Sequence, residues 1–327
     1  WSLRRPVYGL RQAPREWHDT LRTMLAALGF APSTADPSLF LRTDTSLPLF
    51  YVLVYFDDLV FATAETEALA LVKAWCTITL SLSHIVHEVL QRFGFQFSSP
   101  QPTPLSTSHS LSAPPMDESV ELSGPYPELV GCFMYLMTCT RPDLTYPLSL
   151  LARYVALGRH RKVHWDAAKR VLRYLCSTSG MGLVFGGQGP IVLTGHADAS
   201  WVDDSATQRS SQSYTFSLGS GSVSWQSTRS SSVLSSSCEA EIYAGAMAAQ
   251  ELRWLTYLLT DLGEQPHSPP QRGQLRLAYV ATRANTADIF TKALPPGDHQ
   301  RLSTVLGLLA LLFLTGLVTT CSSTVCL

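Results

Sequence analysis

The chain has 327 residues, of which 46% are hydrophobic and only 15% are charged, and its formal net charge is −1. An apolar fraction of this size supports a sizeable core, which excludes a wholly disordered chain, and the length allows two domains. The near-zero net charge excludes an overall field that would draw the protein to nucleic acid or to a membrane, so any such affinity must come from local patches.

The cysteines and the two ends of the chain indicate the cellular compartment of the protein. The seven cysteines are scattered, and none has the spacing of a zinc site, which favours reduced thiols in an intracellular protein of the cytoplasm or nucleus. The opening "WSLRRPVYGL" shows no targeting pattern and reads as the interior of a longer polypeptide. Residues 305–318 carry no charge but are shorter than the ~20 residues of a spanning helix, so we expect an apolar tail rather than a membrane anchor.

The N-terminal part is predicted to form a helix followed by a β-hairpin. In "PREWHDTLRTMLAALG", residues 14–29, apolar residues recur at helical spacing between Pro14 and Gly29. "LPLFYVLVYFDDLVFAT", residues 47–63, reads as two strands around a tight turn that holds Asp57 and Asp58. Adjacent charges within an apolar run need a partner or a metal ion.

The middle of the chain is predicted to be a linker followed by helices. Residues 97–125 begin with "FSSPQPTPLSTSHSLSAPP", whose composition is typical of a mobile linker, and residues 126–186 read as helical. Residues 153–173 contain seven Lys or Arg and one acid. This run is either a solvated helix face or a phosphate-contacting surface. The candidate contacts with nucleic acid are Arg161, Lys162, Lys169, Arg170 and Arg173.

The C-terminal part is predicted to alternate strands and helices. "PIVLTGHADASW" is a strand, "YTFSLGSGSVSW" is a hairpin, and residues 235–263 form the longest helix, with Ser236 and Glu239 as a capping box. "LRLAYV", residues 275–280, is a further strand, and "TADIFTKAL" is a short helix.

Three carboxylates lie near the ends of these predicted elements. Asp198 closes a strand, Glu241 lies in the first turns of the long helix, and Asp288 opens the last helix. Taken alone, each is a common turn or helix-start residue. Brought together, they form an oxygen-only ligand set that suits Mg²⁺, and two such ions support phosphodiester chemistry.

A series of motifs resembles one known family. "VYGLRQAPREWHDTL", "LVYFDDLVFA", "LVGCFMYLMTCTRPDLTYPLSLLARY", "HWDAAKRVLRYL", "HADASWVDD", "SWQSTRSSSVLSSSCEAEIYA" and "NTADIFTKALP" occur in this order. They resemble the C-terminal half of the Pol polyprotein of copia-type LTR retrotransposons. The resemblance implies an α/β (α+β) chain: a reverse transcriptase palm remnant, a helical connection, and a ribonuclease H-like mixed sheet of about five strands, here short by one, with flanking helices. We divide the chain into 1–96 (palm), 97–125 (linker), 126–186 (connection), 187–295 (ribonuclease H-like) and 296–327 (apolar tail).

The resemblance also implies roles for the matched residues. Asp57 and Asp58 match the metal-binding hairpin of the palm, and Arg11 and Gln12 match the segment that steadies the template and the incoming nucleotide. The implied cofactor is Mg²⁺ in two-metal sites, and the implied partners are a template–primer and an RNA:DNA hybrid.

Asp198, Glu241 and Asp288 match three of the four ribonuclease H acids of that family, and Glu241 fits the pattern better than Glu239. The family's third palm aspartate would precede this chain, and residues 264–275 lack its Asp-Asn strand. A missing metal ligand commonly costs orders of magnitude in rate, so we expect both activities to be impaired. Two alternatives stay open, an active ribonuclease H and a non-catalytic nucleic-acid-binding product. The oligomeric state is not predicted.

Overall fold

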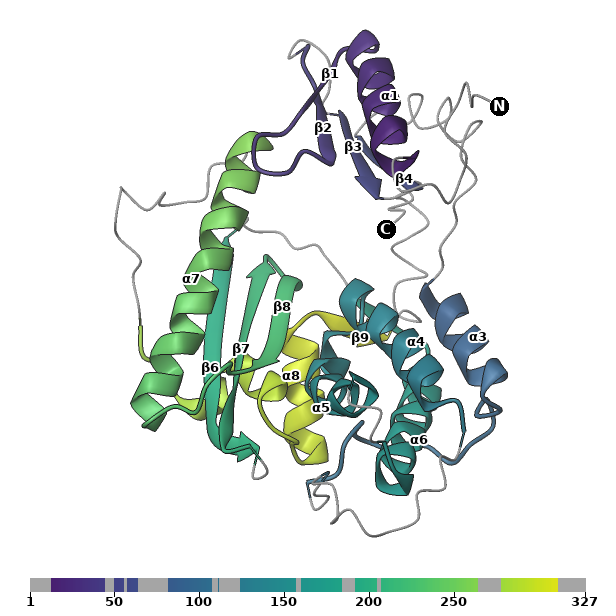
Figure 1. The fold of residues 1–327 in the computed structure, drawn as a ribbon, viewed down its shortest axis with the longest axis vertical. Helices are drawn as coiled ribbons and strands as arrows, with labels where there is room; N and C mark the ends of the chain where they lie inside the picture. The colour runs from purple at the N-terminus through teal and green to yellow at the C-terminus, as the bar shows by residue number, and fades with distance from the viewer. Residues whose placement is uncertain are drawn as a thin grey trace, which may run out of the picture. The chain divides into compact units, whose positions relative to one another are not determined.

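The computed structural model describes residues 13–44, 50–55, 58–63, 82–107, 111, 124–156, 160–183, 192–204, 207–263 and 278–310. The chain divides into two compact units. The first comprises residues 1–80, 254–265 and 316–327, and the second comprises residues 81–253 and 266–315. Each unit combines helices with antiparallel strands (Figure 1), which confirms the predicted α+β class.

The first unit contains the predicted helix and hairpin. Helix α1 (Ala13–Ala27) is followed by a four-stranded antiparallel sheet in the order β1-β2-β3-β4. The strands are β1 (Phe30–Pro32), β2 (Leu39–Arg42), β3 (Phe50–Tyr55) and β4 (Asp58–Thr63). Strands β3 and β4 pair from Phe50 opposite Thr63 to Tyr55 opposite Asp58, so the predicted hairpin is confirmed. A small core of Leu25, Phe30, Phe40, Phe50, Val52 and Val54 joins the helix to the sheet.

The second unit begins with a helical half, whose first helix lies within residues 1–96 and whose other helices lie within residues 126–186. Its helices are α3 (Leu82–Arg92), α4 (Tyr126–Cys139), the 3-10 turn η1 (Pro142–Leu144), α5 (Thr145–Ala156) and α6 (Lys162–Ser177). Helix α6 has a buried apolar face, on which Ala168, Val171, Leu172 and Leu175 are all fully buried. These side chains pack against the apolar faces of α4 and α5, which the same periodicity creates.

Part of the predicted linker packs on this helical core. Thr103, Leu105 and Leu111 are buried, and the Arg170 guanidinium donates a hydrogen bond of 3.0 Å to the Thr103 hydroxyl. The backbone carbonyl of Leu111 also accepts a hydrogen bond from the Tyr154 hydroxyl. The described residues of this segment therefore lie along the connection helices rather than forming a mobile spacer.

A fully buried ion pair lies at the centre of the helical half. Arg141 donates to both carboxylate oxygens of Asp143, at 2.9 and 2.7 Å, and to the hydroxyl of Thr178 at 2.8 Å. The Tyr174 hydroxyl donates to Asp143 at 2.6 Å, and the His299 ring packs edge-on against Tyr174. Burial by itself would raise the pKa of Asp143, but the charge and hydrogen bonds of Arg141 outweigh it and lower the pKa.

The other half of the second unit is a three-stranded antiparallel sheet in the order β6-β7-β8. Its strands are β6 (Leu193–Asp204), β7 (Arg209–Leu218) and β8 (Gly221–Arg229). The predicted β7–β8 hairpin is confirmed by its register, which ends with Leu218 opposite Gly221. Within the described residues this sheet has three strands of alternating direction, and Ala278–Val280, the described end of the predicted strand 275–280, is not in a strand.

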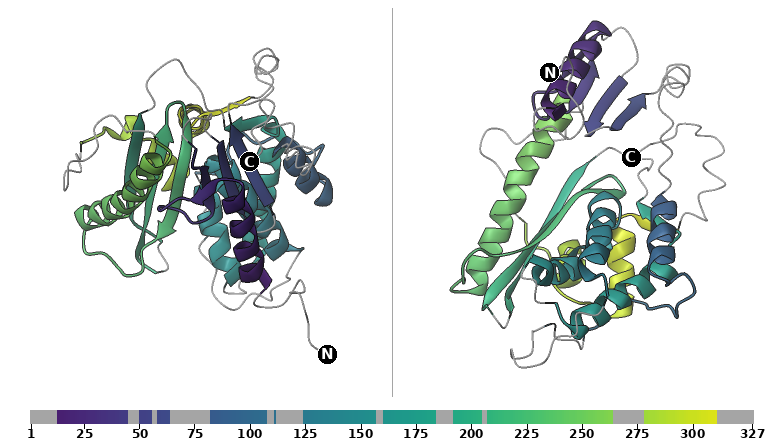
Figure 2. Two further views of the ribbon diagram at one scale, coloured as in Figure 1. Left: turned by 90° about the horizontal axis from the view of Figure 1, so that it is seen from above. Right: turned by 45° about the vertical axis from the view of Figure 1, so that its right-hand side comes forward.

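Helical elements lie on both faces of the sheet (Figures 1 and 2). Helix α7 (Ser237–Asp261) lies on one face, where its Glu251 accepts a hydrogen bond of 2.6 Å from Ser224 of β8. Two 3-10 turns follow, η2 (Thr282–Ala284) and η3 (Thr286–Phe290). Turn η3 packs on the opposite face of the sheet, because it contacts Ser213 and Ser227, which alternate in direction with Ser224.

The described part of the C-terminal apolar stretch is folded. Helix α8 (Pro296–Val305) leads into β9 (Leu308–Ala310), which pairs antiparallel with β5 (Met181–Leu183). Leu302, Leu306 and Leu308 are buried. Across the described ranges of the chain, we find no helix with the length and apolar character needed to cross a membrane.

Candidate acidic functional site

Asp198 lies in the middle of β6 and not at its end. The prediction that it closes the strand is wrong, because β6 continues to Asp204. Asp198 is opposite Ser213 of β7, which is opposite Ser227 of β8, so the three side chains form one row across a single face of the sheet. This is the face on which η3 packs.

The serines of this row fix η3 in place. Ser213 donates a hydrogen bond of 3.1 Å to the carbonyl of Ala287, and Ser227 donates one of 2.6 Å to the carbonyl of Phe290. A 3-10 turn of five residues leaves several carbonyls without internal partners, and these hydroxyls satisfy two of them. The strand residues therefore position the turn that carries Asp288.

Asp288 is 5% exposed and has two different carboxylate oxygens. Its Oδ2 forms an ion pair of 2.9 Å with the ammonium of Lys292, one helical turn later. Its Oδ1 is buried and has no hydrogen-bond partner among the residues that the structure describes. A buried carboxylate oxygen without a partner is costly, so this atom is available to a ligand.

Two polar neighbours hold Asp198 from the turn side. The Thr291 hydroxyl donates a hydrogen bond to its Oδ2, and the Asn285 amide lies 3.4 Å from its Oδ1. The same amide donates a bond of 2.9 Å to the carbonyl of Ala197, and the Asn285 Oδ1 caps η3 by accepting from the N–H of Ala287 at 3.1 Å. Asn285 thus links the strand to the turn.

Glu241 lies in the second turn of α7 and is exposed. Partial burial of its carboxylate raises its pKa, and the backbone of Ala199, the residue after Asp198, opposes this rise. Glu239, the alternative two residues earlier, is bound to Ser235, whose N–H donates to it at 2.6 Å. The preference for Glu241 over Glu239 that the motif implied stays a prediction.

The charges of the three acids act on one another. Burial raises the pKa of Asp198 to about 6, and the nearby Asp288 and Glu241 add to this rise, whereas Thr291 and Lys292 oppose it. Burial also raises the pKa of Glu241, again with a contribution from Asp288. These charges act together on Asp198, whereas hydrogen bonds and the ion pair join only Asp198 and Asp288 to the same short segment.

The donor chemistry of this site fits a hard divalent cation such as Mg²⁺, because the ligand atoms are carboxylate oxygens and one of them is buried without a partner. The acids are not arranged as a complete set of ligands around one position. In the described part of the chain, no group of three or more Asp, Glu, His or Cys side chains is placed to hold an ion. Thr291, Asn285 and Lys292 instead contact the oxygens of Asp198 and Asp288.

The candidate nucleic-acid contacts on and beside α6 fall into two groups. Lys162 and Arg173 are exposed, whereas Arg161, Lys169 and Arg170 are half-buried. Lys169 forms an ion pair of 2.5 Å with Asp166, and Arg170 bonds to Thr103. The structure therefore leaves a narrower basic surface than the charge run suggested.

The remaining predicted site residues belong to the first unit. Asp58 is the first residue of β4, and the structure describes its backbone only. Asp57, Arg11 and Gln12 lie outside the described residues. The β3–β4 register ends with Tyr55 opposite Asp58.

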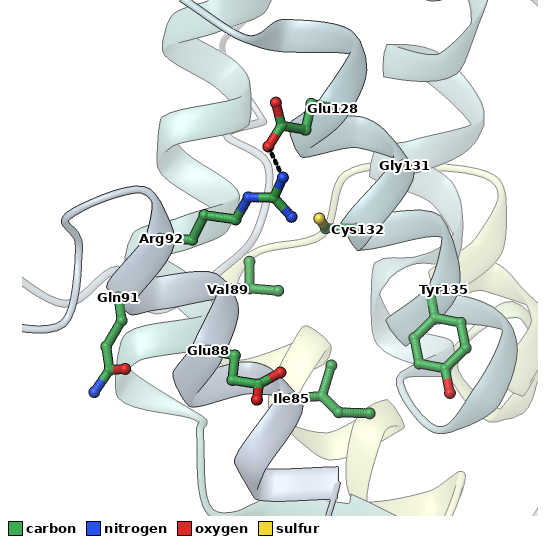
Figure 3. Close-up of a pocket in the computed structure, with 9 residues that line it drawn as sticks. All are labelled: Ile85, Glu88, Val89, Gln91, Arg92, Glu128, Gly131, Cys132 and Tyr135. Carbon is green, nitrogen blue, oxygen red and sulfur yellow. Dashed lines mark ion pairs between the residues drawn. The ribbon is translucent and has the colours of Figure 1, made fainter.

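A separate groove of about 880 Å³ lies between α3 and α4 in the second unit. Figure 3 shows Ile85 and Val89 of α3 facing Cys132 of α4, with the ion pair of Arg92 and Glu128 at one end. The residues that line this groove include none of the predicted site residues.

Sequence reasoning missed three residues of the acidic site. Asn285, Thr291 and Lys292 contact Asp198 or Asp288, and they flank Asp288 at positions −3, +3 and +4 in "NTADIFTK". This spacing places polar side chains on the same side of a helical turn as the acid, and it is the signal that could have identified them.

Comparison with known proteins agrees with the motifs. Residues 1–102 match the family model described as "Reverse transcriptase (RNA-dependent DNA polymerase)". The chain is 30% identical over 370 residues to the Retrovirus-related Pol polyprotein from transposon RE2 of Arabidopsis thaliana, covering 94% of this chain and 25% of that protein. It is 30% identical over 294 residues to the corresponding polyprotein from transposon TNT 1-94 of Nicotiana tabacum, covering 80% of this chain and 22% of that protein.

A shorter relative, Secreted RxLR effector protein 161 of Plasmopara viticola, is 44% identical over 132 residues, which cover 40% of this chain and 92% of that protein. No solved structure matches the chain. The chain spans only 25% and 22% of the two polyproteins named above. On these similarities, the chain belongs to the copia-type family of retrovirus-related Pol polyproteins from transposons, with a reverse transcriptase region at residues 1–102.

Proposed function

We propose that residues 187–295 form a ribonuclease H-like domain that binds RNA:DNA hybrids and hydrolyses the RNA strand slowly. The observation that carries this proposal is the buried oxygen of Asp288 that has no described partner, on a segment that also holds Asp198 through Thr291 and Asn285. Perturbed carboxylates that gather in this way are typical of metal-dependent hydrolytic sites.

The chain's own residues would divide the work at this site. Asp198, Glu241 and Asp288 would hold Mg²⁺, which when bound activates water and stabilises the charge of the phosphodiester transition state. Asn285 and Thr291 fix the carboxylate of Asp198 through their hydrogen bonds. This positioning matters because a metal ligand must be oriented before the ion arrives.

We propose that hydrolysis is impaired because the ligand set is incomplete. The sequence supplies three of the four acids of the family's site, and an ammonium is already bound to Asp288. The described residues also contain no ready group of three ligands. Loss of one ligand leaves the positive charge of the ion uncompensated and commonly reduces the rate by orders of magnitude.

The hybrid would be contacted by the basic surface on α6. Lys162 and Arg173 are its exposed members, and Arg161 lies next to Lys162 at the start of the helix. Because such contacts neutralise phosphates and release counter-ions, binding should weaken steeply with salt. We also propose an intracellular location, which the free thiols of Cys132, Cys139, Cys176 and Cys238 support.

For the reverse transcriptase region, we propose that Asp57 and Asp58 are metal-binding residues and that Arg11 and Gln12 contact template and incoming nucleotide. The paired strands of the β3–β4 hairpin support the first assignment, because the register ends with Tyr55 opposite Asp58. A template–primer binding assay with Asp57→Asn tests it. Mg²⁺-dependent binding should weaken in the variant, and unchanged binding would contradict the assignment.

A labelled RNA:DNA hybrid tests the ribonuclease proposal. The affinity of the purified chain for the hybrid should fall as the salt concentration rises, and this dependence should be shallower in Lys162→Ala. Arg301→Gln, which lies outside the acidic site and the basic surface on α6, should leave the dependence unchanged. Ordinary enzymes turn over at ~1 s⁻¹ or faster, and with Mg²⁺ we expect the chain to be at least roughly 100-fold slower than this. We expect no hydrolysis by the Asp198→Asn variant.

Two outcomes would refute parts of this proposal. Rapid cleavage that Asp198→Asn abolishes would show that the site is complete and that impairment is wrong. Salt-sensitive binding with no hydrolysis at all would show that the chain is a non-catalytic nucleic-acid-binding product.

A further inference from the structure

The ion pair between Lys292 and Asp288 has features that a surface salt bridge lacks. The side chain of Asp288 is 8% exposed, whereas that of Lys292 is 42% exposed, so a mobile cation from the surface reaches down to a buried acid. It binds Oδ2 and leaves Oδ1 without a partner among the described residues. The ammonium therefore compensates the charge of Asp288 without saturating the carboxylate.

Asp198 is held by the same short segment that carries Lys292. Thr291, the residue before Lys292, donates a hydrogen bond to the Oδ2 of Asp198, and the Asn285 amide lies 3.4 Å from its Oδ1. Two carboxylates joined by one segment repel one another, and a nearby ammonium reduces this repulsion.

We infer that Lys292 is a built-in counter-ion of the acidic site, which stabilises Asp288 without metal and competes with a divalent cation for it. The inference rests on the proposed metal-binding function and names the residue that regulates it. A hard cation would take the oxygens of Asp288, and the long, half-exposed side chain of Lys292 can swing away at little cost.

Removal of the Lys292 ammonium should have opposite effects on stability and on Mg²⁺ binding. Removing the ammonium should destabilise the metal-free protein, because the acids then repel one another without compensation. It should also strengthen Mg²⁺ binding, because the ion no longer competes with a resident positive charge. A purely structural salt bridge would produce the first effect alone.

Thermal unfolding of the full chain under Mg²⁺ titration at constant ionic strength tests both consequences. In Lys292→Gln, the metal-free melting temperature should fall by about 2–4 °C, and half-saturation should occur at a roughly three- to tenfold lower Mg²⁺ concentration. Lys292→Arg keeps the charge and should stay close to the parent chain. Arg301→Gln removes a cation from an exposed pair with Asp298 and is the matched control.

The outcomes separate the inference from the proposed function. A Mg²⁺ response that is stronger in Lys292→Gln than in the parent chain and in Arg301→Gln supports the counter-ion. Equal Mg²⁺ responses in all these proteins, lost together in Asp198→Asn, would overturn the counter-ion and leave the metal site standing. No Mg²⁺ response in any of them would overturn the metal site itself and the inference with it. If Lys292→Gln does not fold without metal, rescue by Mg²⁺ supports the inference, and failure of rescue overturns it.

Discussion

Asp143→Ala should be among the most destabilising single substitutions in the second unit. Arg141 and Asp143 are each 1% exposed, and the substitution removes both bonds from the guanidinium and the bond from the Tyr174 hydroxyl. Arg141 would keep its bonds to Thr178, at 3.1 and 2.8 Å, but its charge would stay buried without an opposite charge. Breaking a buried ion pair in this way costs about 3–5 kcal/mol.

This cost can be measured by thermal unfolding followed by circular dichroism. For a unit of this size, it corresponds to a fall in melting temperature of about 6–20 °C. Asp166→Ala is the matched control, because Asp166 pairs with Lys169 at the surface of α6 and should contribute no more than about 1 kcal/mol. The double substitution Arg141→Met with Asp143→Leu should recover much of the loss, since no charge is then left buried.

The pH dependence provides a second measurement on the same pair. The pKa of Asp143 in the folded chain is below its ordinary value of 3.8, so the folded state binds this proton less readily than the unfolded state. The stabilisation should therefore be constant above the ordinary value and decline as the pH falls through the lowered pKa. The reasoning is refuted if Asp143→Ala costs less than about 1 kcal/mol or no more than Asp166→Ala.

Two further predictions concern packing and protonation. Gly195→Ala should cost roughly 1–3 kcal/mol, because a Cβ there would lie 2.2 Å from the ring of Phe216, whereas Gly245→Ala on α7, with no neighbour within 4 Å, should be neutral or stabilising. Equal unfolding midpoints for the two variants would contradict this. His164 is fully buried, its Nε2 lies 3.2 Å from the Leu111 carbonyl, and burial lowers its pKa. The unfolded chain therefore takes up this proton first, so stability should fall as the pH drops below about 6.5, and His164→Gln should make that slope shallower in thermal unfolding at pH 7.5 and 5.5.

Local patterns in the sequence were sufficient for the main elements. Helical periodicity predicted α1, α6 and α7, and alternation around Gly219 and Ser220 predicted the β7–β8 hairpin. These features depend on residues within a few positions of one another, so the sequence carries them directly. The family was also evident from the order of short motifs.

The sequence could not indicate which interactions polar residues make with partners that are distant in the chain. The segment with Thr103 and Leu111 has the composition of a linker, yet Arg170 and Tyr154 hold it on the helical core. Two of the five nucleic-acid contacts predicted in residues 153–173, Lys169 and Arg170, are similarly engaged within the protein. The composition of a segment indicates its solubility and flexibility, but it does not indicate which side chains of the folded protein lie close enough to bind it.

The sequence by itself indicated three candidate acids, because Asp198, Glu241 and Asp288 each lie in a recognisable motif. Only the tertiary structure decided their surroundings. The register of β6 with β7 and β8 places Asp198 in a row with Ser213 and Ser227, and that row holds the turn from which Lys292 reaches Asp288. Hydrogen bonds and charges act over a few ångströms in space, whereas these residues are separated by as many as 93 positions in the chain, as Asp198 is from Thr291.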